Sequence, residues 1–175
     1  MHKTLLVFVF SLVSFSLSAQ TSYEWFSKGK GNFNMGNYAM AIDCYNQVME
    51  IEPESWDALY HRGYSFLMKR DYENAVADFT EVLKHREDDE WAYISRGSAY
   101  NKLRKYELAL SDFNHAITIN GDNADAYNNR GWSKKFLGDK IGACNDWHTS
   151  KQLGNQEAKI ILTNNHCKKK KKKNR

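Results

Sequence analysis

Glycine, alanine and an aromatic residue each recur every 34 residues along the chain. This repeat constrains the fold more strongly than any other feature of the sequence. A segment of that length cannot bury its own apolar face, so neighbouring copies must stack to form a shared core. The recurring residues are four glycines, four alanines and four aromatics: Gly29, Gly63, Gly97 and Gly131; Ala41, Ala75, Ala109 and Ala143; Tyr45, Phe79, Phe113 and Trp147. The sequence therefore predicts a repeat protein.

Each repeat contains two apolar stripes with helical spacing, separated by a short polar or glycine turn. The register gives four repeats, at 22–55, 56–89, 90–123 and 124–154. Glycine in the first helix and alanine in the second would let the two backbones approach closely. One proline in 175 residues fits a nearly all-helical chain, because proline breaks helix interiors. We expect an all-α solenoid of four helix-turn-helix repeats.

The recurring residues resemble the tetratricopeptide repeat (TPR) family, which has the same period. The pattern is clearest in three places: Trp25-x-x-Lys28-Gly29 with Ala41-x-x-x-Tyr45, Tyr93-x-x-Arg96-Gly97-x-x-Tyr100 with Ala109-x-x-x-Phe113, and Ala143-x-x-x-Trp147. It departs from the family at Asn32 and Lys134, where an aromatic residue is expected. The resemblance covers residues 22–154 and implies a non-enzymatic scaffold that binds a protein or an extended peptide.

The same resemblance implies that the ligand lies on the inner face of the first helices. The residues expected in this groove are Tyr23, Phe26, Lys30, Tyr60, Tyr64, Trp91, Ile94, Asn101, Asn128, Trp132 and Lys135. About half of the aromatic stripe is expected to pack in the core instead, as stripes at helical spacing usually do. The two-carboxylate clamp with which chaperone adaptors of this family hold an acidic C-terminus is not reproduced at the matching positions.

Two charged columns run through the last three repeats. An arginine directly precedes each of the last three repeat glycines, and an aspartate follows each arginine by 16 residues. The pairs are Arg62 and Asp78, Arg96 and Asp112, and Arg130 and Asp146. In the first repeat both change together, to Lys28 and Cys44. This joint loss predicts an ion pair between the two helices of each later repeat. We interpret the pairs as structural braces and not as catalytic acids.

The end of the array predicts a cap. Residues 155–167 follow the last repeat and contain a short apolar stripe, which resembles the extra helix of exported TPR proteins from Bacteroidetes-type bacteria. Such a helix covers the apolar face that a terminal repeat would otherwise expose. Cys144 and Cys167 could form a disulfide that ties this cap to the last repeat, or stay as two buried thiols.

The first residues have the composition of a secretory signal. A basic start at His2 and Lys3 precedes a 13-residue stretch of apolar residues and serines, and Ala19 supplies a small residue for cleavage. The stretch is shorter than the ~20 apolar residues that a membrane-spanning helix needs. We therefore expect residues 1–19 to be a signal peptide and the protein to be exported, as a periplasmic or secreted protein.

Residues 168–175 form a basic tail that cannot fold, because its adjacent ammonium groups repel one another. It hides the acidic character of residues 21–167, which hold 17 basic and 21 acidic residues. This balance argues against a specific nucleic-acid surface on the repeats. The lysines from Lys168 to Lys173 could serve solubility alone, or could make weak contacts with an anionic envelope polymer, lipid or nucleic acid.

No motif for a nucleophile, a phosphate loop or a metal site occurs in the sequence. The sequence therefore predicts no cofactor, no metal and no enzymatic activity. Two functions stay open: an adaptor of the cell envelope that binds its partner in the aromatic groove, and an electrostatic tether in which the tail binds a polyanion.

Overall fold

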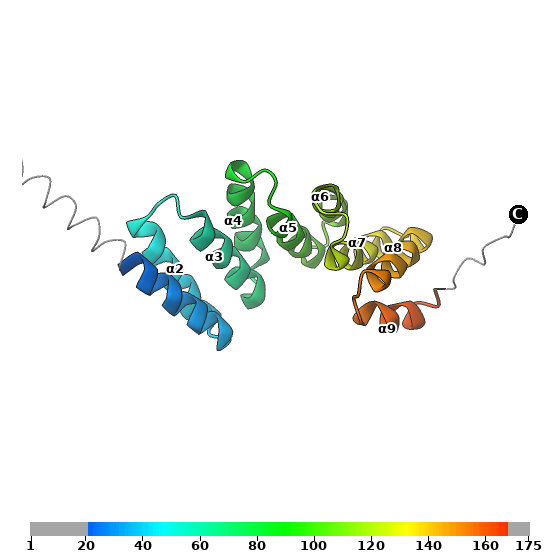
Figure 1. The fold of residues 1–175 in the computed structure, drawn as a ribbon, viewed down its shortest axis with the longest axis horizontal. Helices are drawn as coiled ribbons and strands as arrows, with labels where there is room; N and C mark the ends of the chain where they lie inside the picture. Colours follow the sequence, from blue (N-terminus) through cyan, green and yellow to red (C-terminus); the bar gives the residue numbers. More distant parts are fainter. Residues whose placement is uncertain (1–20, 168–175) are drawn as a thin grey trace, which may run out of the picture. The chain divides into compact units, whose positions relative to one another are not determined.

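The computed structural model describes residues 21–167, and every regular element in that range is a helix. The expected signal peptide and lysine tail lie outside the described residues. A first helix covers residues 21–34 of the described chain. The others are α2 (Tyr38–Ile51), α3 (Trp56–Lys69), α4 (Tyr72–His85), α5 (Glu90–Lys102), α6 (Tyr106–Ile119), α7 (Ala124–Phe136), α8 (Lys140–Gln152) and α9 (Glu157–Asn164), shown in Figure 1. The predicted all-α repeat fold is confirmed.

The chain divides into two compact units, with the boundary after His85. The N-terminal unit contains the helix over residues 21–34 together with α2, α3 and α4, which are the first two predicted repeats. The C-terminal unit contains α5 to α9, which are the last two repeats and the cap (Figure 1). Within each unit, consecutive helices pack against one another as helix hairpins. No helix within residues 21–167 is long and apolar enough to cross a membrane.

The four recurring glycines are required by the four recurring aromatic residues, which pack against them. The side chains of Tyr45, Phe79, Phe113 and Trp147 are at most 1% exposed, and each lies against the glycine of its own repeat. A Cβ atom on Gly131 would lie 2.5 Å from Nε1 of Trp147. Glycine is therefore required where the aromatic ring of the second helix lies directly on the backbone of the first.

The turn inside each repeat uses one backbone conformation. The residues at 36, 70, 104 and 138 all have positive φ, and glycine occupies the first and last of these positions. Arg70 (φ 68°) and Arg104 (φ 59°) adopt the same left-handed conformation. A non-glycine residue in this region costs about 1 kcal/mol or more. The two middle repeats therefore keep arginine at a position that the backbone favours for glycine.

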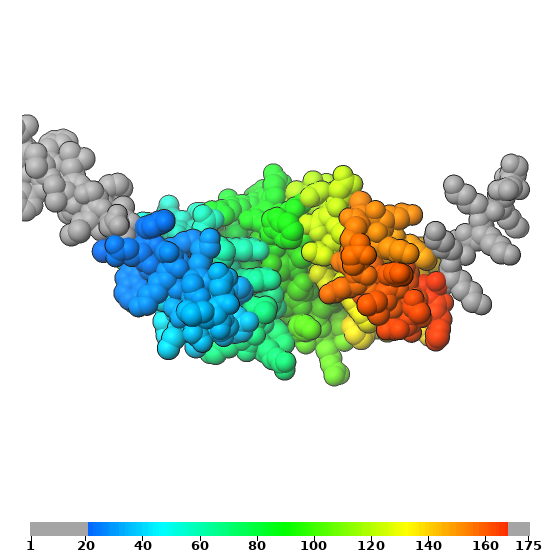
Figure 2. All heavy atoms as spheres, turned by 60° about the horizontal axis from the view of Figure 1, so that its bottom comes forward, coloured from blue at the N-terminus to red at the C-terminus, as the bar shows by residue number. Residues whose placement is uncertain are grey.

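The cap predicted at 155–167 contains α9, which lies on α8 at the end of the C-terminal unit (Figure 2). Ala158 and Leu162 of α9 are buried, and Leu162 packs in one cluster with Ala143 and Trp147. Beyond α9 the structure joins Cys167 to Cys144 of α8 by a disulfide, with 5.5 Å between the two Cα atoms. The outer face of the last repeat is thus covered.

Candidate binding surfaces

The three arginine–aspartate pairs lie within single repeats. The guanidinium of Arg96 donates from Nε and Nη2 to the two carboxylate oxygens of Asp112, at 2.9 and 2.7 Å. The same two-point contact joins Arg62 to Asp78 and Arg130 to Asp146. Each aspartate is buried, and each arginine is half-buried. The contacts brace the two helices of a repeat.

Two of these arginines have a further acceptor that the sequence interpretation missed. Arg62 donates from Nη1 to Oδ1 of Asn46, and Arg130 donates from Nη1 to Oδ1 of Asn114, both at 2.8 Å. Each asparagine lies on the second helix of the preceding repeat, as far before its arginine as the aspartate lies after it. The braces therefore join neighbouring repeats inside each unit as well as the helices of one repeat. This equal spacing was the signal that could have revealed them.

Lys134 departs from the family pattern for a reason that the structure explains. Its Nζ lies 2.8 Å from Oδ2 of Asp146, and the same oxygen accepts a hydrogen bond from Nε of Arg130. The aromatic residue expected at this position is thus replaced by a second cation for the same buried carboxylate. Two donors satisfy more of the carboxylate's lone pairs than one does.

Burial and pairing have opposite effects on the ionisation of the braces. Burial raises the pKa of the Asp78 carboxyl, although the hydrogen bonds and charge of Arg62 lower it. Burial would lower the pKa of the Arg96 guanidinium, but its bonds to Asp112 hold that pKa above its ordinary value. The arginine stays charged under all physiological conditions. The arginines are therefore fixed charges, consistent with a bracing role.

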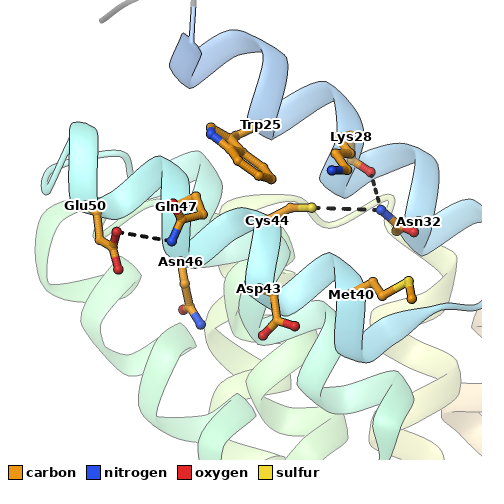
Figure 3. Close-up of a pocket in the computed structure, with 9 residues that line it drawn as sticks. All are labelled: Trp25, Lys28, Asn32, Met40, Asp43, Cys44, Asn46, Gln47 and Glu50. Atoms are coloured by element: carbon orange, nitrogen blue, oxygen red, sulfur yellow. Dashed lines mark hydrogen bonds between the residues drawn. The ribbon is translucent and has the colours of Figure 1, made fainter.

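The first repeat has a different cluster in the same place. Nδ2 of Asn32 donates to the backbone carbonyl of Lys28 at 3.0 Å and to Sγ of Cys44 at 3.8 Å. The ammonium of Lys28 lies 4.7 Å from the centre of the Trp25 ring. Figure 3 shows these side chains on the helix over residues 21–34 and on α2. A neutral amide–thiol contact here replaces the charged brace.

An open cavity of about 660 Å³ lies beside this cluster (Figure 3). It is lined by Trp25, Lys28, Asn32, Met40, Asp43, Cys44, Asn46, Gln47 and Glu50. Burial raises the pKa of the Cys44 thiol, so Cys44 is a protonated and unreactive thiol near neutral pH. Only 4% of Cys44 is exposed, as expected for a small residue packed in place of the missing aspartate.

The groove residues predicted in the N-terminal unit form an aromatic surface. Tyr23 is 71% exposed, and Phe26 packs edge-on against Tyr45 and His61. Tyr60 and Tyr64 stack with 6.4 Å between ring centres. Lys30 is exposed on the same helix as Phe26. Part of this surface therefore belongs to the core and part is available to a ligand.

In the C-terminal unit the groove prediction is wrong at Ile94. Its side chain is only 7% exposed and packs in the core with Phe113 and Ala116. The same helical stripe contains Trp91, which is 52% exposed. Spacing alone does not separate these positions, because a residue at the edge of a helix stripe can face either the core or the groove.

A second cavity, of about 780 Å³, lies along α5 and α7 of the C-terminal unit. It includes three of the predicted groove residues, namely Asn101, Asn128 and Trp132. Ser98, on the same inner face of α5, also lines it. The remaining lining residues were not predicted: Lys102, Arg104, Tyr106, Asn129, Phe136 and Glu157. Several of them lie in turns or at helix ends, where helical spacing carries no information.

The polar groups of this cavity differ in how they are satisfied. Oδ1 of Asn101 accepts from Ser133 at 2.9 Å, and its Nδ2 donates to the carbonyl of Asn129 at 3.4 Å. By contrast, Oδ1 of Asn128 is buried and has no hydrogen-bond partner among the described residues. Asn101 therefore holds α5 against α7, whereas Asn128 has an unused acceptor.

The last predicted groove residue, Lys135, has a different neighbourhood. Its ammonium lies 4.8 Å from the centre of the Trp132 ring. Its side chain lines a separate cavity of about 250 Å³ beside Cys144 and Trp147. Within residues 21–167, no group of three histidine, cysteine, aspartate or glutamate side chains could hold a metal ion.

Models of the tetratricopeptide repeat match residues 26–90 and 92–123, together more than half of the chain. The chain belongs to the tetratricopeptide repeat family. Beyond the matched residues, α7 and α8 repeat the same glycine–aromatic contact and the same brace. No curated protein sequence matches the chain significantly.

Solved TPR structures share this fold. A thermophilic TPR protein of Thermus thermophilus is 18% identical, with a TM-score of 0.73 over 83% of this chain and 81% of that one. MamA from Desulfovibrio magneticus is 20% identical, with a TM-score of 0.72 over 75% of each chain. The first TPR domain of human RPAP3 is 25% identical, with a TM-score of 0.64 over 69% of this chain and 95% of that domain. TPR folds are typical of non-catalytic scaffolds for protein interaction.

Proposed function

We propose that the protein is a non-enzymatic adaptor of the bacterial cell envelope, which binds a protein or an extended peptide on the inner face of its first helices. The observation that carries this proposal is the cavity along α5 and α7, with the aromatic side chains of Trp132 and Phe136 in its wall. Aromatic residues contribute most to binding energy at protein interfaces. A cavity that combines them with polar groups suits a peptide ligand.

The envelope location rests on the sequence. The signal-like residues 1–19 support export, and the last repeat with its cap resembles exported TPR proteins of Bacteroidetes-type bacteria. The disulfide between Cys144 and Cys167 is compatible with an oxidising compartment. Cell fractionation would test the location directly, and recovery of the uncleaved chain from the cytoplasm would contradict it.

The function is tested by affinity capture from native envelope extract. Residues 20–175 serve as one bait, and the same chain ending at Cys167 serves as the other, each at low and at high salt. We expect one discrete protein to be retained by both baits at both salt concentrations, because contacts in an aromatic groove depend little on salt. Mass spectrometry would identify it.

Surface variants separate groove binding from general adhesion. We expect Trp91→Ala or Trp132→Ala to weaken binding of the captured protein about tenfold, or about 1.4 kcal/mol. Ile141→Ala is the control, because Ile141 is 69% exposed but lies on α8, a second helix. Equal losses for the control and the groove variants would contradict the proposal.

A second candidate function follows from the six consecutive lysines, Lys168 to Lys173. Such a tail would bind an anionic envelope polymer, lipid or nucleic acid as a non-specific tether. This binding would disappear at high salt and in the chain that ends at Cys167. Capture by the tailed bait alone, and only at low salt, would replace the adaptor by the tether.

A further inference from the structure

The cavity of the C-terminal unit runs along α7 between two ends that can be identified. α5 and α7 are parallel, because Glu90 meets Asn123 at their start and Asn101 meets Ser133 further along. The cavity follows α7 from Asn128 to Phe136. This stretch spans about 12 Å at the rise of an α-helix. An extended peptide covers that distance with about four residues.

The two ends carry opposite charges. Glu157 lies at the Asn128 end, because Asn155, two residues before it, donates to Asp125 in the first turn of α7. Arg104 lies at the Phe136 end, because the ring of Phe136 stacks on Tyr106 with 4.8 Å between centres. Lys102 also lines the cavity, two residues before Arg104. A ligand would therefore find cations at one end and a carboxylate at the other.

The middle of the cavity is aromatic. The ring centres of Trp132 and Phe136 lie 6.1 Å apart, and Phe136 is 54% exposed. Trp132 is held from behind by Trp147, with 5.1 Å between ring centres. These rings form a rigid platform for an aromatic or large apolar side chain of a ligand.

Asn128 adds an unused acceptor. Its buried Oδ1 has no partner among the described residues, although most buried polar atoms in proteins have one. The side chain lines the cavity, and the terminal torsion of asparagine rotates easily. A small rotation would turn this oxygen towards a ligand N–H, so a peptide backbone would satisfy it.

Arg104 is retained against the preference of its own backbone. It adopts φ 59° at a turn position that is glycine in the first and last repeats. Glycine would adopt this conformation without strain. Arg70 shares this conformation in the N-terminal unit, so what distinguishes Arg104 is that its side chain also lines the cavity.

We propose that this cavity binds an extended segment of about four residues with a carboxylate at the Arg104 end and an aromatic or large apolar side chain over Trp132 and Phe136. The inference rests on the proposed adaptor function and names the chemistry of its ligand. The guanidinium of Arg104 pairs with the carboxylate, and Asn128 accepts a backbone N–H. The carboxylate is either an Asp or Glu side chain or the C-terminus of the partner.

The test uses the purified protein and a panel of fluorescein-labelled hexapeptides. One peptide position is aspartate, asparagine or lysine, and another is phenylalanine or alanine, each peptide with a free or amidated C-terminus. Fluorescence anisotropy gives the dissociation constants. We expect peptides with both a carboxylate and phenylalanine to bind at least tenfold more tightly than those that lack either. The free and amidated forms show whether a side chain or the C-terminus supplies the carboxylate.

Arg104→Gly is the decisive variant, because it removes the guanidinium and also relieves the backbone. We expect it to weaken binding of acidic peptides at least tenfold without lowering the thermal midpoint of unfolding. Arg70→Gly is the matched control, since Arg70 has the same conformation in the N-terminal unit and does not line this cavity. It should change the dissociation constant less than twofold. Neutral peptides should not distinguish Arg104→Gly from the wild type.

The outcomes separate this inference from the function on which it rests. Peptide binding without a preference for a carboxylate, or without sensitivity to Arg104→Gly, would overturn the inference and leave the adaptor function intact. The same holds if no peptide binds but an envelope protein is still captured through the groove. If neither peptides nor an envelope protein bind, both proposals fail.

Discussion

The first and the last repeat solve the same packing problem with different chemistry. In the last repeat, the carboxylate of Asp146 forms salt bridges with both Arg130 and Lys134. All three side chains lie at the contact between α7 and α8. In the first repeat, Asn32 contacts Cys44 beside an open cavity. A charged brace is thus present in the three repeats that follow another repeat, and a buried neutral contact beside an open cavity is present in the first.

The difference teaches what a repeat position is selected for. Asn32 and Lys134 each replace the aromatic residue expected at their position. Asn32 contacts Cys44 and Lys134 contacts Asp146, and in each case the partner occupies the aspartate position of the same repeat. In the first repeat all three positions change together, whereas in the last repeat only the aromatic position changes and the brace stays. A substitution that looks like a family violation in isolation is compensated by its neighbour, so the fold tolerates it.

Loss of the carboxylate in the last repeat should have the largest effect. Asp146→Ala leaves Arg130 and Lys134 without a carboxylate, and removal of one partner of a buried ion pair costs about 3–5 kcal/mol. Cys44→Ala, the matching change in the first repeat, should cost about 1 kcal/mol. Urea unfolding followed by circular dichroism measures both. Equal losses would show that the two clusters do not differ in strength.

The disulfide is the next largest contribution to the stability of the last repeat. Cys167→Ser opens a loop with a sequence separation of 23 and should lower the free energy of unfolding by about 3 kcal/mol. A reducing agent should destabilise the wild type by a similar amount. It should leave Cys167→Ser unchanged, and a further loss in that variant would point to a different thiol.

Replacing two different glycines by alanine should change the free energy of unfolding in opposite directions. Gly131→Ala forces a methyl group against Trp147 and should destabilise by about 2 kcal/mol. Gly31→Ala, in the first repeat, meets no atom within 4 Å and should stabilise its helix by about 0.5–1 kcal/mol. Thermal unfolding of both variants measures this difference. A stabilising Gly131→Ala would mean that Trp147 can move away.

Two substitutions in the first repeat would recreate the arginine–aspartate pair of the later repeats. We expect Cys44→Asp alone to destabilise, because it buries a carboxylate without an arginine. Adding Lys28→Arg should recover about 0.5–1 kcal/mol, since the cavity leaves the pair close to solvent. A double-mutant cycle in urea measures the coupling. Zero coupling would mean that a charged pair at this open site adds no stability.

The smallest expected effect is a pH dependence of the N-terminal unit. Burial, together with the charge of Lys30, lowers the pKa of His61 below its ordinary value of 6.5. The neutral ring is therefore favoured in the folded state, and its contribution to stability is present above pH 6.5. It is lost as the pH falls through the lower folded pKa. His61→Gln should flatten the decline of thermal stability on acidification from pH 7 to 5, and an unchanged slope would contradict this.

The repeats were predictable because the contacts that define them recur. Gly131 and Trp147 touch in the structure as their spacing implied, and the joint change at Lys28 and Cys44 indicated the braces. Ile94 was misassigned because core and groove residues share one helical stripe. Arg104 was missed because it lies in a turn, outside any stripe. Cavities depend on side-chain conformations, which spacing does not specify.

The covered end of the array has a consequence for assembly. Stacking of one TPR chain onto the next would require the outer face of the last repeat to accept the first repeat of another copy. α9 occupies that face, and the Cys144–Cys167 bond fastens the segment that follows it. A subunit with one end blocked in this way cannot add a copy of itself there, so open filaments of this protein cannot grow through that face.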